Sequence, residues 1–120
     1  MMNPKVIKIS TLQEASKEIE EIGCDRESIP IMAPKAVARM IKLYDISSID
    51  AIIIKQDMLS VGGDVAIPRD TYFGGKDKKV DILVIGTIKQ IRELIEKLKR
   101  QYPRIQNISK KLEEVLEEEL

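Results

Sequence analysis

The residue types best suited to chemistry are concentrated in one stretch, KQDMLSVGGD, residues 55–64. An amine, an amide and two carboxylates flank a glycine pair there: Lys55, Gln56, Asp57 and Asp64 around Gly62-Gly63. Such groups can transfer protons or hold a polar ligand. On a helix, however, neighbouring side chains project about 100 degrees apart, so the first three cannot all face one pocket. Two interpretations remain open: a capped helix with solvated charges, which is the simpler one, or a ligand or partner contact by Lys55 or Gln56.

The glycines raise the question of a phosphate site. Phosphate cradles lie at the amino end of a helix, where the dipole is positive, whereas Gly62-Gly63 follows a predicted helix. Gly86-Thr87 is the better candidate, because it separates a predicted strand from a predicted helix. It has one glycine and no Walker lysine, so ordinary capping by Thr87 is the competing interpretation. The contact candidates are Lys55, Gln56, Asp64, Gly86 and Thr87.

Two other features have weaker claims to a site. The segment Tyr72-Phe73-Gly74-Gly75-Lys76 could form an aromatic binding lip or tuck under its loop as a small apolar cluster. Cys24 precedes Asp25 and Glu27, whose negative charges disfavour a thiolate nucleophile.

Composition narrows the chemistry further. The chain has no histidine and one cysteine, which removes the commonest general base and the ligands of a structural zinc site. We therefore expect no metal and no cofactor. Any catalysis would rest on carboxylates, lysine or tyrosine.

Length and charge bound the class of protein. The 120 residues suffice for one domain, residues 1–120, and Lys plus Arg (20) balance Asp plus Glu (20), which argues against nonspecific nucleic-acid binding. No apolar run approaches the roughly 20 residues that span a bilayer, and MMNPKVIKIS lacks the layout of a signal peptide. We expect a cytoplasmic protein without membrane contact. The 33% of charged residues, without Trp, is typical of heat-loving microbes.

Periodicity predicts the amino-terminal elements. Residues 5–9 contain three β-branched residues, Val6, Ile7 and Ile9, and predict a first strand. Residues 11–23 predict a helix with overlapping capping boxes at Ser10-x-x-Gln13 and Thr11-x-x-Glu14 and a stop at Gly23. Residues 24–34 contain two prolines and predict an ordered connection without a helix. Residues 36–45 alternate in polarity and predict a second strand.

The next helix is predicted at residues 48–61 against the β propensity of its isoleucines. Ser47-x-x-Asp50 is a helix-start signature, and a glycine pair follows the segment. The spacing of its apolar residues defines one stripe, namely Ile49, Ile52, Ile53, Gln56 and Leu59. Gln56 would therefore need a hydrogen-bond partner if that stripe is buried.

The remaining elements complete the predicted fold. Residues 65–67 and 81–85 predict strands on either side of a polar loop, residues 68–79. Thr87-x-x-Gln90 opens a helix that Tyr102-Pro103 breaks, and a last helix is capped by Asn107. The order β-α-β-α-β-β-α-α predicts an α+β two-layer sandwich with a mixed four-stranded sheet and about four helices.

Three runs carry a family resemblance: KQDMLSVGGD at 55–64, VDILVIGT at 80–87 and KLKRQ at 97–101. The chain resembles the amino-terminal extension of a subset of bacterial and archaeal dihydropteroate synthases, and the similarity continues upstream through residues 19–43. Synthases of that family join a pterin pyrophosphate to p-aminobenzoate on a barrel domain with an Asn-x-Thr-x-Asp-Ser-Phe segment. That segment is absent here, so the resemblance implies the extension alone, without the catalytic barrel, and transfers no catalytic residue.

Three functional hypotheses follow. The first is a noncatalytic accessory or interaction domain beside a barrel-type pterin-binding protein in pterin or one-carbon metabolism. The second is a small-ligand binder, for a pterin or an anionic metabolite, or a modest enzyme using Lys55, Asp57 and Asp64. The third is a homo-oligomer in which the acidic terminal helix packs against a second copy.

Overall fold

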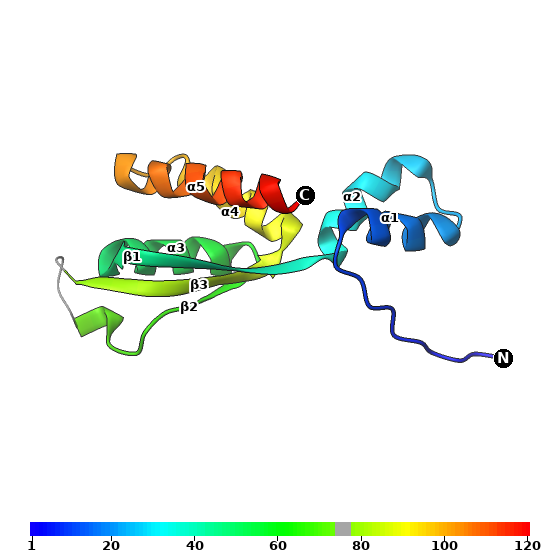
Figure 1. Cartoon of the computed structure of the whole chain (residues 1–120), viewed down its shortest axis with the longest axis horizontal. Coiled ribbons are helices and arrows are strands. Elements are labelled where there is room, and N and C mark those ends of the chain that lie inside the picture. Colours follow the sequence, from blue (N-terminus) through cyan, green and yellow to red (C-terminus); the bar gives the residue numbers. More distant parts are fainter. Residues whose placement is uncertain (74–77) are drawn as a thin grey trace.

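The computed structural model describes residues 1–73 and 78–120 (Figure 1). The elements are α1 (Leu12–Glu21), α2 (Ile29–Ala36), β1 (Ala38–Ser47), α3 (Ser48–Ser60), β2 (Asp64–Ala66), β3 (Lys79–Thr87), α4 (Ile88–Leu98) and α5 (Pro103–Glu119), with 3-10 turns at Arg26–Ser28 and Thr71–Phe73. The mixed α+β class is confirmed. The described residues form five α-helices and three strands, in place of the expected four of each.

The sheet has the order β1-β3-β2, and both neighbouring pairs are antiparallel. Ala38 lies opposite Thr87 and Ser47 opposite Lys79, so β3 runs the full length of β1. The prediction of a mixed sheet is wrong in this respect. β1 and β2 are parallel to each other, but β3 lies between them, so the connection through α3 passes over a central strand.

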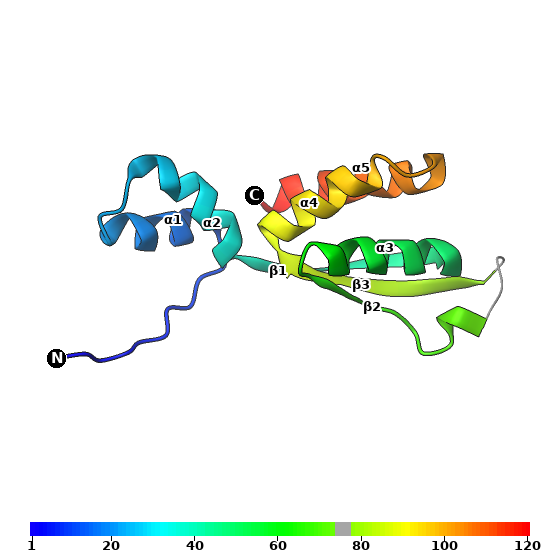
Figure 2. The same cartoon turned by 180° about the vertical axis from the view of Figure 1, so that it is seen from behind.

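The helices α3, α4 and α5 all lie on one face of the sheet (Figures 1 and 2). α3 packs over β2 and β3, α4 packs against α3, and α5 packs on α4. Large apolar side chains from these layers are fully buried, among them Ile54, Met58, Val84, Ile91 and Leu98. No described α-helix covers the opposite face, where Met40 is 63% and Tyr44 65% exposed.

The predicted first strand, residues 5–9, is wrong. This segment belongs to no strand and runs away from the sheet as an extended arm on the side of α1 (Figure 1), with Val6 81% exposed. β propensity favours an extended backbone but does not supply a neighbouring strand. The outer edge of β1 consequently stays unpaired among the described residues.

The predicted connection at residues 24–34 is also wrong, because it contains most of α2. Pro30 lies in the first turn of this helix, where its missing N–H has no intrahelical acceptor to lose. Pro34 lies inside the helix and is buried with Ala33. Packing of α2 against α1 and α4 thus outweighs the loss of a hydrogen bond in a two-turn helix.

The predicted helix at residues 48–61 is confirmed, but its buried face is a different one. Ala51, Ile54 and Met58 are buried, whereas Gln56 and Leu59 are exposed. Isoleucines occur on most sides of α3, so apolar periodicity does not single out one face. Ser47 is the residue before the helix, yet its hydroxyl makes no capping hydrogen bond.

Side-chain capping is confirmed at two helix starts. Thr11 with Glu14, and Thr87 with Gln90, each form both bonds of a capping box. The second predicted box at the start of α1 is wrong, since the Ser10 backbone and hydroxyl both donate to Glu14 and not to Gln13. The predicted start of the last helix is wrong too. α5 begins at Pro103, because proline suits a first helical turn, and Asn107 lies inside the helix.

Candidate functional site

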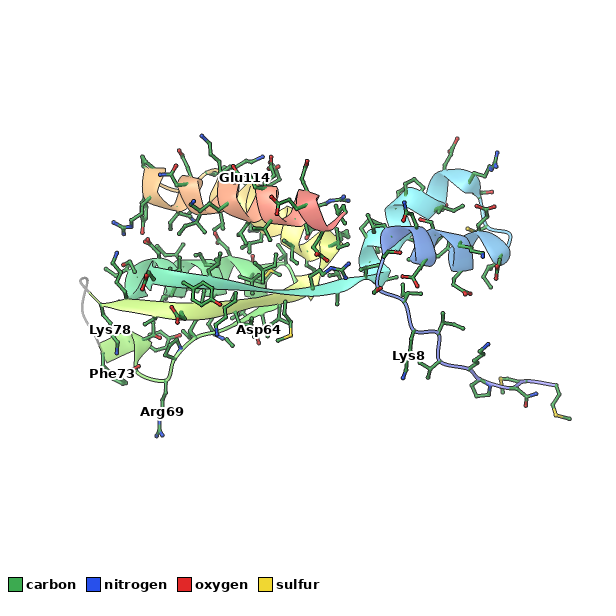
Figure 3. All side chains as sticks on the ribbon, in the orientation of Figure 1. Lys8, Asp64, Arg69, Phe73, Lys78 and Glu114 are labelled. Carbon is green, nitrogen blue, oxygen red and sulfur yellow. The ribbon has the colours of Figure 1, made fainter. Side chains whose placement is uncertain are left out.

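Lys55 and Asp64, two of the predicted contact residues, are brought together where α3 passes over β2. Lys55 Nζ donates to Asp64 Oδ1 at 3.1 Å and to the Val65 carbonyl at 2.8 Å. The Val65 backbone N–H also donates to Asp64 Oδ1, at 2.7 Å. The hydrogen bond from Val65, and then that from Lys55, lower the pKa of Asp64. The two side chains neutralise each other at the surface and join α3 to β2; Figure 3 labels Asp64.

The two residues that follow Lys55 point elsewhere. Gln56 is exposed, and Asp57 Oδ2 accepts a hydrogen bond from Gln101 Nε2 at 3.1 Å, at the end of α4. The side chains of Lys55, Gln56 and Asp57 therefore project in three different directions from α3, as helical geometry requires. These residues do not form one pocket.

The two glycine sites meet each other at the end of the sheet. A Cβ at Gly63 would lie 2.5 Å from Met58 Cε and 2.8 Å from the Ile85 carbonyl oxygen, and one at Gly86 would overlap the same methyl group. Gly62 has a φ of 96°, a left-handed conformation that favours glycine. These glycines allow the end of α3 to approach β3 closely, which is a packing role.

Three backbone donors at the start of α4 are engaged. The Thr87 N–H donates to Gln90 Oε1 at 2.8 Å, and the Gln90 N–H donates to Thr87 Oγ1 at 3.1 Å. The Ile88 N–H donates to the Val37 carbonyl at 2.9 Å. An anion at Gly86-Thr87 would have to displace these protein acceptors, so the geometry favours capping there.

A polar cluster that the sequence did not indicate joins α3 to α5. Asp50 is only 1% exposed. Arg104 contacts it through both oxygens, with Nε to Oδ2 at 2.5 Å and Nη2 to Oδ1 at 2.8 Å. The Tyr102 hydroxyl donates to Asp50 Oδ1 and lies 3.2 Å from Arg104 Nη2.

The charges in this cluster stabilise each other. Burial alone would raise the pKa of Asp50, but hydrogen bonds from Arg104 and Tyr102 outweigh it and lower that pKa. Burial, followed by the neighbouring Asp50, raises the pKa of Tyr102, and Asp50 raises the pKa of Arg104. A carboxylate with all its partners in place is not a proton acceptor, so we assign the cluster a structural role. Its only signal in the sequence was Ser47-x-x-Asp50, which predicts a local cap and not partners 52 and 54 positions away.

A hollow lies between β1 and α5. Its volume is about 640 Å³, within the range of about 300–1,000 Å³ of ligand pockets. Its apolar lining comes from Ile41, Leu43 and Ile46 on one side and Ile108, Val115 and Leu116 on the other. We call it the β1–α5 groove. Because β1 is an edge strand, the groove opens along the edge of the sheet.

Arg39 closes one end of the β1–α5 groove. Its Nε donates to Glu119 Oε1 at 3.0 Å, its Nη1 to the Ala38 carbonyl at 2.9 Å, and its Nη2 to the Ser10 carbonyl. The end of α5, the start of β1 and the root of the amino-terminal arm therefore meet at one guanidinium group.

The loop after β2 and the cysteine add no site. Phe73 is 85% exposed and Tyr72 is also exposed, while residues 74–76 of the predicted lip lie outside the described residues. Cys24 Sγ contacts the Ile19 carbonyl at 3.7 Å. The described residues contain no group of three or more metal-ligating side chains and no helix of the length and apolarity needed to cross a membrane.

Comparison with known proteins gives one curated relative. The chain is 29% identical over 100 residues to a bifunctional dihydropteroate synthase/dihydropteroate reductase of Helicobacter pylori (strain ATCC 700392 / 26695). This similarity covers 83% of the chain but only 24% of the relative. No protein-family model and no solved structure matches. The chain is thus related to a part of a folate-pathway enzyme. Its correspondence to an amino-terminal extension stays a prediction.

Proposed function

We propose that this chain is a noncatalytic accessory domain of pterin or folate metabolism that binds another protein through the edge of β1. The free strand edge beside the β1–α5 groove carries this proposal. Two further observations support it. The charged side chains that could do chemistry are hydrogen-bonded to one another. The relative that the chain resembles is an enzyme, and the chain spans only about a quarter of it.

The geometry of β1 suits the addition of an extended peptide. Ala38 to Leu43 pair with β3 in regular register and leave their other edge open. The register shifts after Leu43, and Asp45 has a φ of 54°, so the usable edge ends there. A peptide bound at this edge would direct alternate side chains into the groove and onto the open face beside Met40.

The partner we propose is a barrel-type pterin-binding protein. The relative is named for two activities, synthase and reductase, in one chain, and the present chain resembles part of it. A separate catalytic protein would supply the remaining part, and the β1 edge would hold the two together.

Binding to a purified dihydropteroate synthase tests the proposal by titration calorimetry. We expect a complex with the unchanged chain, and at least tenfold weaker binding when Met40→Asp and Tyr44→Asp place charges beside the β1 edge. Leu59→Asp is the matched control, because Leu59 is similarly exposed but lies on α3. Absence of a complex with the unchanged chain, or equal weakening by Leu59→Asp, would reject the β1 edge as the binding surface.

A second candidate function is binding of a flat heterocycle in the β1–α5 groove. Its apolar walls, with Arg39 and Lys111 at the rim, suit an aromatic ring system with a polar substituent. In the sequence-based hypothesis, ligand binding lies at Lys55, Asp57 and Asp64. Because Lys55 and Asp57 point in different directions, we place it in the β1–α5 groove instead. A pterin at 100 times its dissociation constant should stabilise the fold by about 2.7 kcal/mol. Val115→Trp should abolish that thermal shift by filling the groove, whereas Lys55→Met should preserve it.

A further inference from the structure

The chain has as many basic as acidic residues, but unpaired cations and unpaired carboxylates lie on different parts of the helical layer. Five lysine or arginine residues lie in α4 or directly after it, between positions 89 and 100, and they differ in their partners. Lys89 pairs with Glu93, and Lys99 pairs with Glu96 and Glu113. In contrast, three cations make no ion pair or side-chain hydrogen bond with any described residue: Arg92, Lys97 and Arg100.

These three cations line a shallow groove between α2 and α4. Its volume is about 560 Å³, and its apolar walls come from Pro30, Ile31, Pro34 and Val61. Ile31 is 61% exposed there. We call this hollow the α2–α4 groove. Glu93 and Glu96 also line it, but each is paired with a lysine, Lys89 and Lys99 respectively. The apolar walls and the three unpaired cations suit an acidic segment that also carries an apolar side chain.

The end of α5 has the opposite character. Glu114, Glu117 and Glu118 make no ion pair with a described residue, and the terminal Leu120 is 47% exposed. Glu114 lies on the side of α5 that faces away from the sheet (Figure 3). The last two turns of α5 therefore offer three free carboxylates and one exposed apolar side chain, matching the three cations and the apolar floor of the α2–α4 groove.

The two surfaces adjoin each other. Arg92 lines the α2–α4 groove and also borders, with Glu117 and Leu120, a smaller hollow of about 310 Å³ between α4 and α5. Adjacent complementary patches satisfy the geometry of a closed two-fold dimer, since the rotation places each patch on its counterpart in the other copy. Within one chain, α4 packs against both α2 and α5.

We propose that two copies of this chain form a two-fold dimer in which the carboxyl-terminal end of α5 of each copy occupies the α2–α4 groove of the other. Carboxylates of Glu117 and Glu118 pair with Arg92 and Arg100, and Leu120 covers Ile31. The contact goes beyond the proposed function. It uses the end of α5 and the α2–α4 groove, and it does not use the β1 edge.

Molar mass in solution, measured by light scattering after size exclusion, tests the dimer through a charge exchange. The unchanged chain should have twice the mass of one chain at low ionic strength and dissociate as salt rises, because screening weakens exposed ion pairs. Arg92→Glu with Arg100→Glu should give a monomer, and so should Glu117→Lys with Glu118→Lys. An equimolar mixture of these two variants should restore the dimeric mass, since each groove then meets a helix end of opposite charge.

A matched control changes charge elsewhere by the same amount. Lys5→Glu with Lys8→Glu alters the exposed arm and should leave the dimer intact. Far-ultraviolet circular dichroism of each variant shows whether the helices persist. A monomeric unchanged chain, a charge-reversed variant that stays dimeric, or a mixture that stays monomeric would each overturn the proposal. None of these results bears on synthase binding through Met40 and Tyr44.

Discussion

Among single residues, Asp50 has the most demanding environment, because a buried carboxylate depends on Arg104 and Tyr102 for compensation. Arg104→Leu should lower the free energy of unfolding, since it leaves the buried carboxylate of Asp50 without its main partner. Urea denaturation at pH 7 measures this loss. Asp50→Asn combined with Arg104→Leu should recover part of it, whereas a single variant within about 0.5 kcal/mol of the unchanged chain would contradict the role.

The same carboxylate predicts a pH dependence. Because the pKa of Asp50 is lower in the folded state, its contribution to stability is fully present above the ordinary carboxyl pKa of about 3.9. It is lost as the pH falls through the lowered folded value. Asp50→Asn should therefore be less stable than the unchanged chain at pH 7, and the difference should shrink below about pH 4. If the difference in stability between the two proteins stays constant from pH 7 to pH 2, the charge of Asp50 is not its cause.

Gly86 gives a second prediction at this scale. A methyl group there would overlap Met58 Cε, so Gly86→Ala should destabilise the fold by about 1–3 kcal/mol through overpacking. Met58→Val in the same chain should relieve part of this cost by removing the colliding methyl group. Thermal unfolding of the two single variants and the double variant measures the coupling. Additive effects would show that the two residues do not meet.

At the scale of elements, local signals determined what the sequence could predict. Capping boxes at Thr11 and Thr87 placed two helix starts, and continuous apolar residues placed β3, because each signal acts within a few residues. The failures have a common cause in tertiary contacts. The face of α3 was ambiguous because isoleucine surrounds the helix, and α2 forms despite Pro34 because neighbouring helices bury it.

Two helix-start residues separate a real cap from an apparent one. Thr87→Ala should cost about 1 kcal/mol, because it removes the acceptor for the Gln90 N–H. Asn107→Ala should be neutral or stabilise by up to roughly 0.5 kcal/mol, because Asn107 is exposed inside α5, where alanine is the better helix former. Chemical denaturation of both variants provides the comparison. If Asn107→Ala lowers the stability as much as Thr87→Ala does, Asn107 caps the helix, as the sequence predicted.

At the scale of the whole molecule, we propose that residues 1–120 unfold as one unit. α2 packs against α4, and the Ile88 N–H bonds to the Val37 carbonyl just before β1, so the α1–α2 pair is connected to the helical layer. Thermal unfolding should show coincident transitions by far-ultraviolet circular dichroism and tyrosine fluorescence. Deleting residues 1–8 should leave the midpoint unchanged within about 2 °C, since these side chains are exposed. An earlier separate transition of the helices would instead indicate two units.

The grooves of the candidate sites could not be predicted from the sequence, because they too depend on tertiary contacts. Lys55 and Asp64, two of the predicted contact candidates, form an ion pair with each other, and their role as a contact site stays a prediction. The β1–α5 groove combines a strand with a distant helix, and the α2–α4 groove combines helices that are distant in the chain, so neither has a local pattern. The residue types indicated which side chains could do chemistry. The positions of the grooves depend on how α5 and α2 pack, which the sequence did not reveal.

The register of the sheet also bears on how the chain folds. β2 and β3 pair across one loop, whereas the β1–β3 ladder joins Ala38 to Thr87 and Ser47 to Lys79, with α3 and β2 in between. Closing such distant segments loses chain entropy before any contact compensates for it, which slows folding. We expect the β2–β3 hairpin and α4 to organise first and β1 to join last. The strand with the open edge is then also the last to be protected during synthesis.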